Sequence, residues 1–314
     1  MKSKDVLGLR YLTREEITNI LDTASHFREV NKRRIKKVPT LRGRTVIMAF
    51  FENSTRTKTS FELAAKRLSA DVISFSASTS ATKKGETLMD TARNLDAMNP
   101  DAMIIRHPQT GAPHMLAANF PWSVVNAGDG INEHPSQALL DMLTMRDQFG
   151  DFTGKTVAIV GDIFHSRVAR SNIIGLTKMG AKVVAAGPGT MCPVQLREMN
   201  VEIRHSIDEV LPDADAIMML RIQRERLGKA MLSSVFEYAS FYGFDMDRLS
   251  KARPNVMVLH PGPINRGVEM MPAVADSERS VIMQQVTNGI AVRMALLYLA
   301  LGGEVINGGN HATT

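Results

Sequence analysis

Hydroxyl and cationic side chains are concentrated in one short segment of the chain. Residues 54–60 read STRTKTS, which places five hydroxyl groups and two cations in seven positions. The residues that follow, up to Leu68, have the pattern of an amphipathic helix. The unpaired N–H groups and the dipole of a helix N-terminus favour a bound anion, and the guanidinium of Arg56 matches phosphate oxygens. We therefore interpret residues 54–57 as a phosphate-binding segment.

The simpler alternative for this segment is an ordinary helix cap. Thr59 is followed three residues later by Glu62, which is the spacing of a capping box and predicts a helix over residues 59–68. Capping accounts for these two residues but gives no role to the hydroxyl groups that precede them. Phosphate binding is the better interpretation.

Polar side chains also follow other predicted strands. In open parallel sheets, ligands bind beyond the carboxyl ends of the strands. The side chains at these ends are Glu52, Arg106, His107, His134, Gln137, His165, Arg167, Arg170, Arg221, Gln223, Arg226 and His260. Most of them are basic or form hydrogen bonds, and few are acidic. The sequence therefore predicts a site for anions.

Two groups in this set allow more than one interpretation. Pro135 suits the first position of a helix, which leaves His134 at the cap and Gln137 one turn on. A lone histidine there is either a capping residue or a functional one, and both readings stay open. Arg167 and Arg221 taken singly could form surface ion pairs. Together, at neighbouring strand ends, they make a dicarboxylate site plausible.

Several cofactor and metal motifs are missing from the sequence. The segment TVAIVGDIFHSRVARSN resembles a dinucleotide-binding turn but lacks the later glycines of that motif, so a nicotinamide cofactor is not expected. Metal-binding Cys/His spacings, a serine nucleophile elbow and a Walker A loop are also missing. We expect a site without cofactor, metal or covalent intermediate.

Composition indicates an ordinary globular protein of 314 residues, 44% hydrophobic and 22% charged. No apolar run reaches the ~20 residues of a membrane span, and the first residues do not resemble a signal peptide. The single cysteine, Cys192, suits a reducing compartment, so a cytoplasmic location is expected. The net charge is +6, and residues 31–38 (NKRRIKKV) could form a nucleic-acid patch. A solvated helix end is the preferred reading, so neither nucleic acid nor membrane is expected as a partner.

Short apolar runs alternate with helical patterns along the chain, which is typical of an α/β fold with parallel sheets. Strands are predicted at residues 45–51, 71–76, 102–105, 123–126, 156–160, 182–186, 216–220 and 256–259. Helices are predicted at residues 59–68, 86–98, 135–149, 166–179, 193–199 and 284–301. This order predicts two domains, each with a parallel sheet of about four or five strands flanked by helices.

Four motifs together resemble the aspartate/ornithine carbamoyltransferase family, and within it the aspartate carbamoyltransferase catalytic chains: ENSTRTKTSFE, HPSQALLDMLT, GDIFHSRVARS and HPGPINRGVE. The resemblance covers essentially the whole chain in the expected order. It implies a carbamoyl-phosphate-binding domain over residues 1–133, to which a C-terminal helix within residues 290–314 returns, and an aspartate-binding domain over residues 134–289.

The resemblance also implies a reaction. The carbamoyl group of carbamoyl phosphate would pass to the α-amine of L-aspartate, giving N-carbamoyl-L-aspartate and phosphate, an early step of de novo pyrimidine biosynthesis. The implied mechanism is sequential, non-covalent and metal-free, with stabilisation of an oxyanion.

Residue roles are carried over from the matching motifs. The implied catalytic residues are Arg56, Thr57, Lys84, Arg106 and His134. The implied carbamoyl phosphate ligands are Ser54, Thr55, Arg56, Thr57, Ser80, Lys84, Arg106, His134 and Gln137. The implied aspartate ligands are Lys84, Arg167, Arg221, Gln223, Gly262 and Pro263. Glu52 would bridge to Arg167 and Arg226 as a latch when the domains close, unless it merely balances nearby arginines.

The family also implies a homotrimer in which Ser80 and Lys84, from the loop STSATKKGE, reach the active site of a neighbouring subunit. A regulatory chain or a dihydroorotase partner is left open. The ornithine enzymes are the nearest alternative, but they carry an H-C-L-P-type motif where this chain has HPGP. A catalytically silent scaffold would have lost the phosphate or lysine motifs, and both are present.

Overall fold

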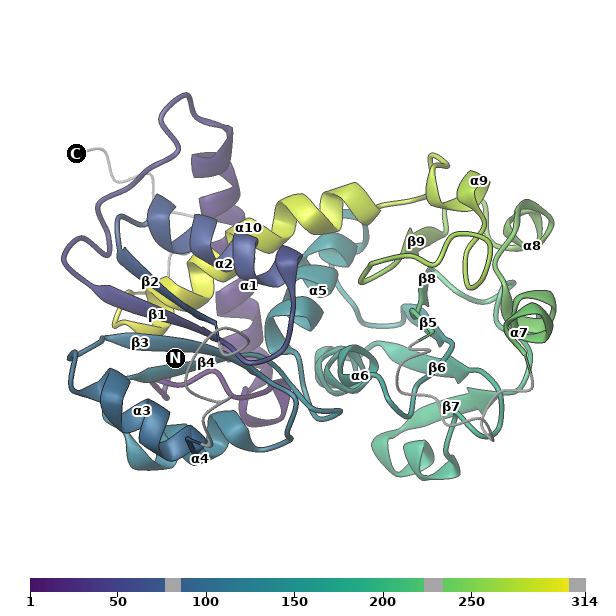
Figure 1. Cartoon of the computed structure of the whole chain (residues 1–314). Coiled ribbons are helices and arrows are strands. Elements are labelled where there is room, and N and C mark those ends of the chain that lie inside the picture. Colours follow the sequence, from purple (N-terminus) through teal and green to yellow (C-terminus); the bar gives the residue numbers. More distant parts are fainter. Residues whose placement is uncertain (77–85, 223–233, 305–314) are drawn as a thin grey trace. The chain divides into compact units, whose positions relative to one another are not determined.

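The computed structural model describes residues 1–76, 86–222 and 234–304. The chain divides into two compact units (Figure 1), Met1–Leu143 with Thr287–Thr314 and Thr144–Val286. Helix α5 (Pro135–Phe149) begins in the first unit and ends in the second, and α10 (Ile282–Ala300) begins in the second and ends in the first. Sequence prediction started the second domain at residue 134, whereas the start of α5 lies in the first unit.

The first unit contains a parallel four-stranded sheet in the order β2–β1–β3–β4. Its strands are β1 (Thr45–Phe50), β2 (Asp71–Ser76), β3 (Ala102–His107) and β4 (Ser123–Asp129). All four were predicted, and β3 and β4 extend beyond the predicted ranges. The pairing of β3 with β4 shifts register between Ile105 and His107, so Arg106 lies at an irregularity of the sheet.

Both faces of this sheet are covered by helices (Figure 1). The helices of the unit besides α5 and α10 are α1 (Arg14–Lys32), α2 (Thr55–Arg67), α3 (Leu88–Asp96) and α4 (Ala112–Asn119), with a 3-10 turn η1 (Leu9–Tyr11). One face packs on α3 and α4 through a buried cluster that includes Ile47, Met103 and Leu116. Figure 1 shows α2 and α10 on the opposite face. The return of the C-terminal helix to the first unit was predicted and is confirmed.

The second unit contains a parallel five-stranded sheet in the order β7–β6–β5–β8–β9. Its strands are β5 (Thr156–Val160), β6 (Lys182–Ala186), β7 (Val201–Arg204), β8 (Ala216–Met219) and β9 (Met257–Leu259). Its further helices are α6 (Arg167–Met179), α7 (Val235–Tyr242), α8 (Met246–Lys251) and α9 (Pro272–Ala275). Two parallel sheets flanked by helices confirm the predicted fold class.

Two features of this unit differ from the prediction. Residues 193–199 were predicted as an α-helix but form the 3-10 helix η3 (Val194–Met199). The next residue, Asn200, takes a left-handed conformation (φ 58°) and turns the chain directly into β7. Strand β7 was not predicted. It is a four-residue edge strand in which Val201 and Ile203 alternate with charged residues, so it forms no apolar run.

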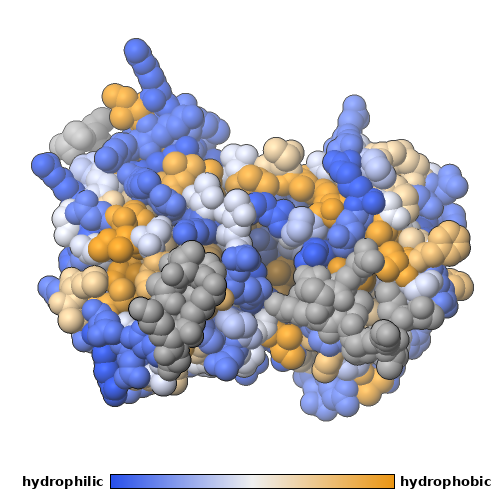
Figure 2. Space-filling model, viewed as in Figure 1, coloured by the Kyte–Doolittle hydropathy of each residue, from blue (hydrophilic) through white to orange (hydrophobic). Residues whose placement is uncertain are grey.

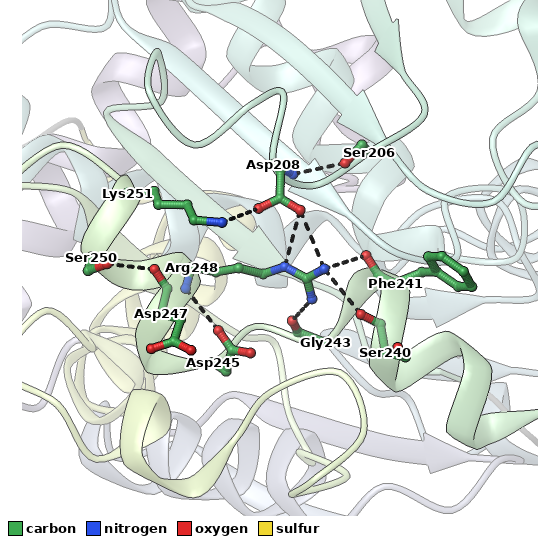
Figure 3. A network of polar contacts seen from close by, with 10 residues as sticks. All are labelled: Ser206, Asp208, Ser240, Phe241, Gly243, Asp245, Asp247, Arg248, Ser250 and Lys251. Carbon is green, nitrogen blue, oxygen red and sulfur yellow. Dashed lines mark hydrogen bonds and ion pairs between the residues drawn. The ribbon is translucent and has the colours of Figure 1, made fainter.

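The C-terminal end of α7 is fixed by one arginine of α8 (Figure 3). The guanidinium of Arg248 donates hydrogen bonds to the carbonyl oxygens of Ser240 (3.1 Å), Phe241 (3.0 Å) and Gly243. It also contacts the carboxylate of Asp208 at 3.4 Å. The last carbonyl groups of a helix lack partners within the helix, so Arg248 acts as a C-terminal cap.

The surface drawn in Figure 2 is mostly hydrophilic, with smaller hydrophobic areas between the polar ones. Large apolar side chains are nonetheless exposed in places, among them Phe236 and Met283. Among the residues that the structure describes, no helix is both long and apolar enough to cross a membrane.

Candidate active site

The N-terminus of α2 carries the hydroxyl-rich segment. Helix α2 begins at Thr55, not at Thr59 as predicted, and Ser54 is its N-cap. Thr59 therefore lies within the helix, and Glu62 forms an ion pair with Lys66 at 2.7 Å, so the capping-box interpretation was wrong. The hydroxyl of Ser54 forms no hydrogen bond with the helix backbone. The first-turn N–H groups of α2 are thus not capped by this side chain.

Ser54 differs in this respect from serines that cap other helices. Ser166 accepts a hydrogen bond from the N–H group of Ala169 at 3.1 Å, and Ser234 accepts one from that of Glu237 at 2.9 Å. The side chains at the start of α2 also differ in exposure, since Thr55 and Arg56 are exposed and Thr57 is buried. Hydroxyl groups, backbone donors and a guanidinium meet at one helix terminus, which is suited to a phosphate group.

Arg106 lies beside this terminus because β1 and β3 are neighbouring strands. Phe50, the last residue of β1, pairs with Arg106, and the N–H group of Phe51 donates to the carbonyl oxygen of Arg106 at 2.9 Å. The Arg106 side chain is 12% exposed and contacts the Glu52 carboxylate at 3.2 Å. Arg106 is thus a partner of Glu52 that the sequence did not reveal, and the proposed latch to Arg167 and Arg226 stays a prediction.

His107 follows Arg106 but has a supporting role. Its Nδ1 atom accepts a hydrogen bond from the backbone N–H group of Gln109 at 3.0 Å. Burial lowers the pKa of His107, so the neutral imidazole is favoured. The ring also packs against Phe51, with 5.0 Å between the centroids.

His134 and Gln137 lie in the first unit, at the start of α5. The helix begins at Pro135 as predicted, and the N–H group of Gln137 donates to the carbonyl oxygen of His134 at 3.0 Å. Both side chains are buried. The turn before them is fixed by Asp129, whose carboxylate accepts hydrogen bonds from Gly111, Asn126, Asn132 and Glu133. Because β4 neighbours β3, this turn leaves the sheet at the same edge as Arg106.

The second unit carries another basic group of strand ends. Arg167 is the first residue of α6, follows β5 and is buried. His165 before it contacts the buried carboxylate of Asp162 at 3.0 Å. Arg170, one turn later, lines an apolar pocket of about 270 Å³ together with residues such as Phe164 and Ile173. Arg167 is therefore the better candidate for a carboxylate ligand at this strand end.

Arg221 lies next to the end of β5 because β8 pairs with that strand. Val160 pairs with Met219, and the N–H group of Leu220 donates to the carbonyl oxygen of Val160 at 2.8 Å. Gly161, which directly follows the strand, has φ 126°, and a Cβ atom there would lie 3.2 Å from Leu220 Cβ. Glycine therefore permits the close approach of these two strand ends.

Gly262 and Pro263 follow β9, the neighbour of β8. The N–H group of Gly262 donates to His260 Nδ1 at 2.7 Å, so the ring proton is on Nε2, which lies 3.2 Å from Glu269 Oε1. The buried Glu269 carboxylate also accepts hydrogen bonds from the backbone and side chain of Asn265. Sequence reasoning missed Glu269, as it missed Asp129. An isolated acidic residue in a loop gives no signal of its own.

Four predicted site residues lie outside the described residues: Ser80, Lys84, Gln223 and Arg226. The others fall into two groups. In the first unit, the residues follow the carboxyl ends of β1, β3 and β4. In the second unit, they follow the carboxyl ends of β5, β8 and β9. Each group is basic, and each is built on adjacent parallel strands.

Two family models match the chain. The model described as "Aspartate/ornithine carbamoyltransferase, carbamoyl-P binding domain" matches residues 4–147, and "Aspartate/ornithine carbamoyltransferase, Asp/Orn binding domain" matches residues 153–300. Curated relatives include the aspartate carbamoyltransferase catalytic subunit of Geobacter sulfurreducens, 60% identical over 97% of this chain and 98% of that one. The catalytic subunit of Syntrophotalea carbinolica is 59% identical over 96% of each chain.

Solved structures match the fold as well. Aspartate transcarbamoylase from Trypanosoma cruzi, in complex with carbamoyl phosphate and aspartate, has a TM-score of 0.85 and 29% identity, covering 94% of this chain and 96% of that one. Ornithine carbamoyltransferase from Pyrococcus furiosus has a TM-score of 0.85 and 32% identity, covering 96% and 97%. Because the family models span most of the sequence and relatives more than half identical align over nearly all of it, the chain belongs to the aspartate/ornithine carbamoyltransferase family.

Proposed function

We propose that this chain transfers the carbamoyl group of carbamoyl phosphate to the α-amine of L-aspartate. The products are N-carbamoyl-L-aspartate and phosphate, and the reaction is an early step of de novo pyrimidine biosynthesis. The curated relatives are named for this activity, and the Trypanosoma cruzi enzyme was solved with both substrates. The observation that carries the proposal is the N-terminus of α2, where Ser54 is an N-cap whose hydroxyl makes no bond to its own helix.

The donor is held by the first unit. Its phosphate accepts hydrogen bonds from the first-turn N–H groups of α2 and from the hydroxyl groups of Ser54, Thr55 and Thr57. Arg56 adds a charge-assisted bond to a phosphate oxygen. This assignment is supported by the exposure of Thr55 and Arg56 and by the absence of a capping bond at Ser54.

The reacting carbonyl is bound by Thr57, Arg106 and His134. As the aspartate amine attacks the carbamoyl carbon, negative charge develops on the carbonyl oxygen, and donors already in place stabilise it. Glu52 restrains the Arg106 guanidinium through their 3.2 Å contact. Removal of one such donor typically lowers the rate on the order of 10²- to 10³-fold. His134 acts as a hydrogen-bond donor, and the departing phosphate takes the proton of the amine.

The acceptor is held by the second unit. Arg167 and Arg221 follow the adjacent strands β5 and β8 and bind the two carboxylates of aspartate, with Gln223 as a further ligand. Backbone groups of Gly262 and Pro263 complete this part of the site. The support is the burial of Arg167 and the hydrogen bonds of His260 and Glu269 that fix the loop after β9.

The assembly we propose is a homotrimer with shared active sites. Ser80 and Lys84 reach the site of a neighbouring subunit, where Lys84 adds positive charge beside both substrates. The same proposal includes a division into domains over residues 1–133 and 134–289 and a cytoplasmic location. It also includes the latch formed by Glu52, Arg167 and Arg226. Its basis is the match of the motifs to the family.

Parallel acceptor assays test the function directly. The purified chain is given carbamoyl phosphate with either L-aspartate or L-ornithine, and the carbamoylated products are separated and measured. We expect N-carbamoyl-aspartate and no detectable citrulline, and native mass determination should give the mass of three chains. Preference for ornithine, or no product with either acceptor, would contradict the proposed function.

A further inference from the structure

The carboxamide of Gln137 is bound by a buried carboxylate one helical turn along α5. Gln137 Nε2 donates to Asp141 Oδ1 over 2.9 Å, and Asp141 is completely buried. A carboxylate only accepts hydrogen bonds, so the NH₂ end of the Gln137 carboxamide must face Asp141. The carbonyl oxygen of Gln137 is the end that can accept from another group.

The buried charge of Asp141 is compensated by Arg293 of α10. Arg293 is 4% exposed, and its guanidinium lies 5.1 Å from the centroid of the Phe61 ring. Burial lowers the pKa of Arg293 to about 10, the charge of Asp141 opposes this shift, and the charges of Arg56 and Arg106 add to it. Arg293 is therefore positively charged at neutral pH.

These interactions place the Asp141–Arg293 pair close to residues of the proposed donor site. Arg56 and Arg106 are near enough for their charges to act on Arg293. The guanidinium also packs directly beside Gly289, since a Cβ atom there would lie 2.5 Å from Arg293 Nη1. Arg293 thus lies against the ring of Phe61 and beside Gly289 of its own helix, within electrostatic range of Asp141.

We propose that Asp141, whose charge is offset by that of Arg293, orients the Gln137 carboxamide so that its carbonyl oxygen accepts a hydrogen bond from the amino group of carbamoyl phosphate. The inference rests on the proposed function. In the opposite orientation, the NH₂ group of Gln137 would face the NH₂ group of the donor, and two donors cannot pair. Asp141 and Arg293 are positioning residues, because they act on the substrate through Gln137.

This arrangement selects carbamoyl phosphate over acyl phosphates that have a methyl group in place of the amino group. Acetyl phosphate carries the same phosphate and carbonyl groups but cannot donate to Gln137. A buried carbonyl oxygen without a partner is unfavourable, so the enzyme discriminates against such donors. The discrimination depends on the fixed orientation of the carboxamide.

The variant Asp141→Asn tests the proposal. Asparagine keeps the shape of the side chain but offers both a donor and an acceptor, so the Gln137 carboxamide no longer has one favoured orientation. The quantity measured is kcat/KM for phosphate release in the presence of aspartate, with carbamoyl phosphate and with acetyl phosphate. We expect roughly a 10-fold loss with carbamoyl phosphate and less than about a 2-fold loss with acetyl phosphate.

A purely structural role for Asp141 would lower both values by the same factor. A folded Asp141→Asn protein with an unchanged ratio of the two kcat/KM values would therefore overturn the inference. In a Gln137→Ala background, Asp141→Asn should leave the ratio unchanged, because the group through which it acts is gone. If the wild-type chain forms no N-carbamoyl-aspartate, the proposed function fails instead.

The chain offers a matched control on the same helix. Gln284 Nε2 donates to Asp147 Oδ2, also over 2.9 Å, but on the exposed surface. Asp147→Asn should therefore keep the wild-type ratio. If Asp141→Asn does not fold, Asp141→Glu keeps the charge that Arg293 requires and displaces the acceptor by one methylene. Its ratio should fall at least about threefold, and an unchanged ratio would also overturn the inference.

Discussion

Replacement of Ser54 by alanine separates phosphate binding from helix capping. A serine that caps a helix through its side chain contributes about 0.5–2 kcal/mol to stability. Ser54 makes no such bond, so Ser54→Ala should change the free energy of unfolding by less than about 0.5 kcal/mol. The matched control is Ser234→Ala, which removes the 2.9 Å bond to the N–H group of Glu237 and should cost about 1 kcal/mol.

The loss of phosphate affinity can be worked out from the same structure. A hydrogen bond to a charged group contributes about 1.5–3 kcal/mol, and each 1.4 kcal/mol is a factor of ten in affinity. Ser54 is half-buried, so solvent competes for the bond and the lower end of this range applies. Ser54→Ala should therefore weaken phosphate binding roughly 10-fold, whereas Ser234→Ala should leave it unchanged.

Two measurements check this prediction. Isothermal titration calorimetry gives the affinity for inorganic phosphate, and chemical unfolding gives the stability of each variant. The reasoning is refuted if Ser54→Ala loses stability as Ser234→Ala does while keeping wild-type affinity for phosphate. Ser54 would then be an ordinary cap whose bond forms in solution, and the hydroxyl-rich terminus would need another explanation.

Three further predictions follow from the fold and the proposed site. Arg167→Ala should raise the KM for aspartate about 100-fold while carbamoyl phosphate affinity changes little, as measured by steady-state kinetics and calorimetry. Arg248→Ala removes three capping bonds to α7 and should lower the free energy of unfolding by about 2–3 kcal/mol in chemical unfolding. As a control, Lys251→Ala removes only an exposed contact to Asp208, which Arg248 also contacts, and should cost less than about 0.5 kcal/mol. Lys84→Gln and Arg56→Ala chains, each nearly inactive alone, should regain activity in mixed trimers, and verified mixing without recovery would contradict the shared site.

The central strands were predictable because their residues are buried and form apolar runs. The segment TVIMAF of β1 is buried from Val46 to Phe50, as is typical of a parallel strand covered on both faces. Edge strand β7 escaped prediction because its alternation of apolar and charged residues extends over only four positions. A strand buried on both faces, such as β1, is therefore easier to recognise in the sequence than a short edge strand such as β7.

The start of α2 was misplaced for a different reason. Thr59 and Glu62 have the spacing of a capping box, yet Thr59 lies one turn inside the helix. A true capping box is present at α1, where Thr13 accepts from the N–H group of Glu16 and the Glu16 side chain accepts from that of Thr13. Sequence spacing does not distinguish a true capping box from this chance match, because the start of α2 also depends on where the preceding strand β1 ends.

The candidate site was predictable where its residues follow strands directly. Strand order places Arg106 beside the end of β1 and Arg221 beside the end of β5, and both were named from the sequence. The partners that hold these residues were not predictable, because they pair across long sequence distances. The same holds for Arg293, whose charge acts on Asp141 from a helix far along the chain that has a largely apolar sequence.

On the proposed assignment, the sign of charge in the second unit distinguishes the two acceptors, whereas overall structural similarity does not. Solved aspartate and ornithine enzymes match this fold about equally well, so the fold alone does not select between them. Two unit charges about 4 Å apart interact by about 4 kcal/mol near a protein surface. If Arg167 and Arg221 bind the acceptor as proposed, they favour a second carboxylate and repel the terminal ammonium of ornithine. Because these arginines follow adjacent strands, reversing the preference would require a change of charge at these positions, while the donor site in the first unit could stay as it is.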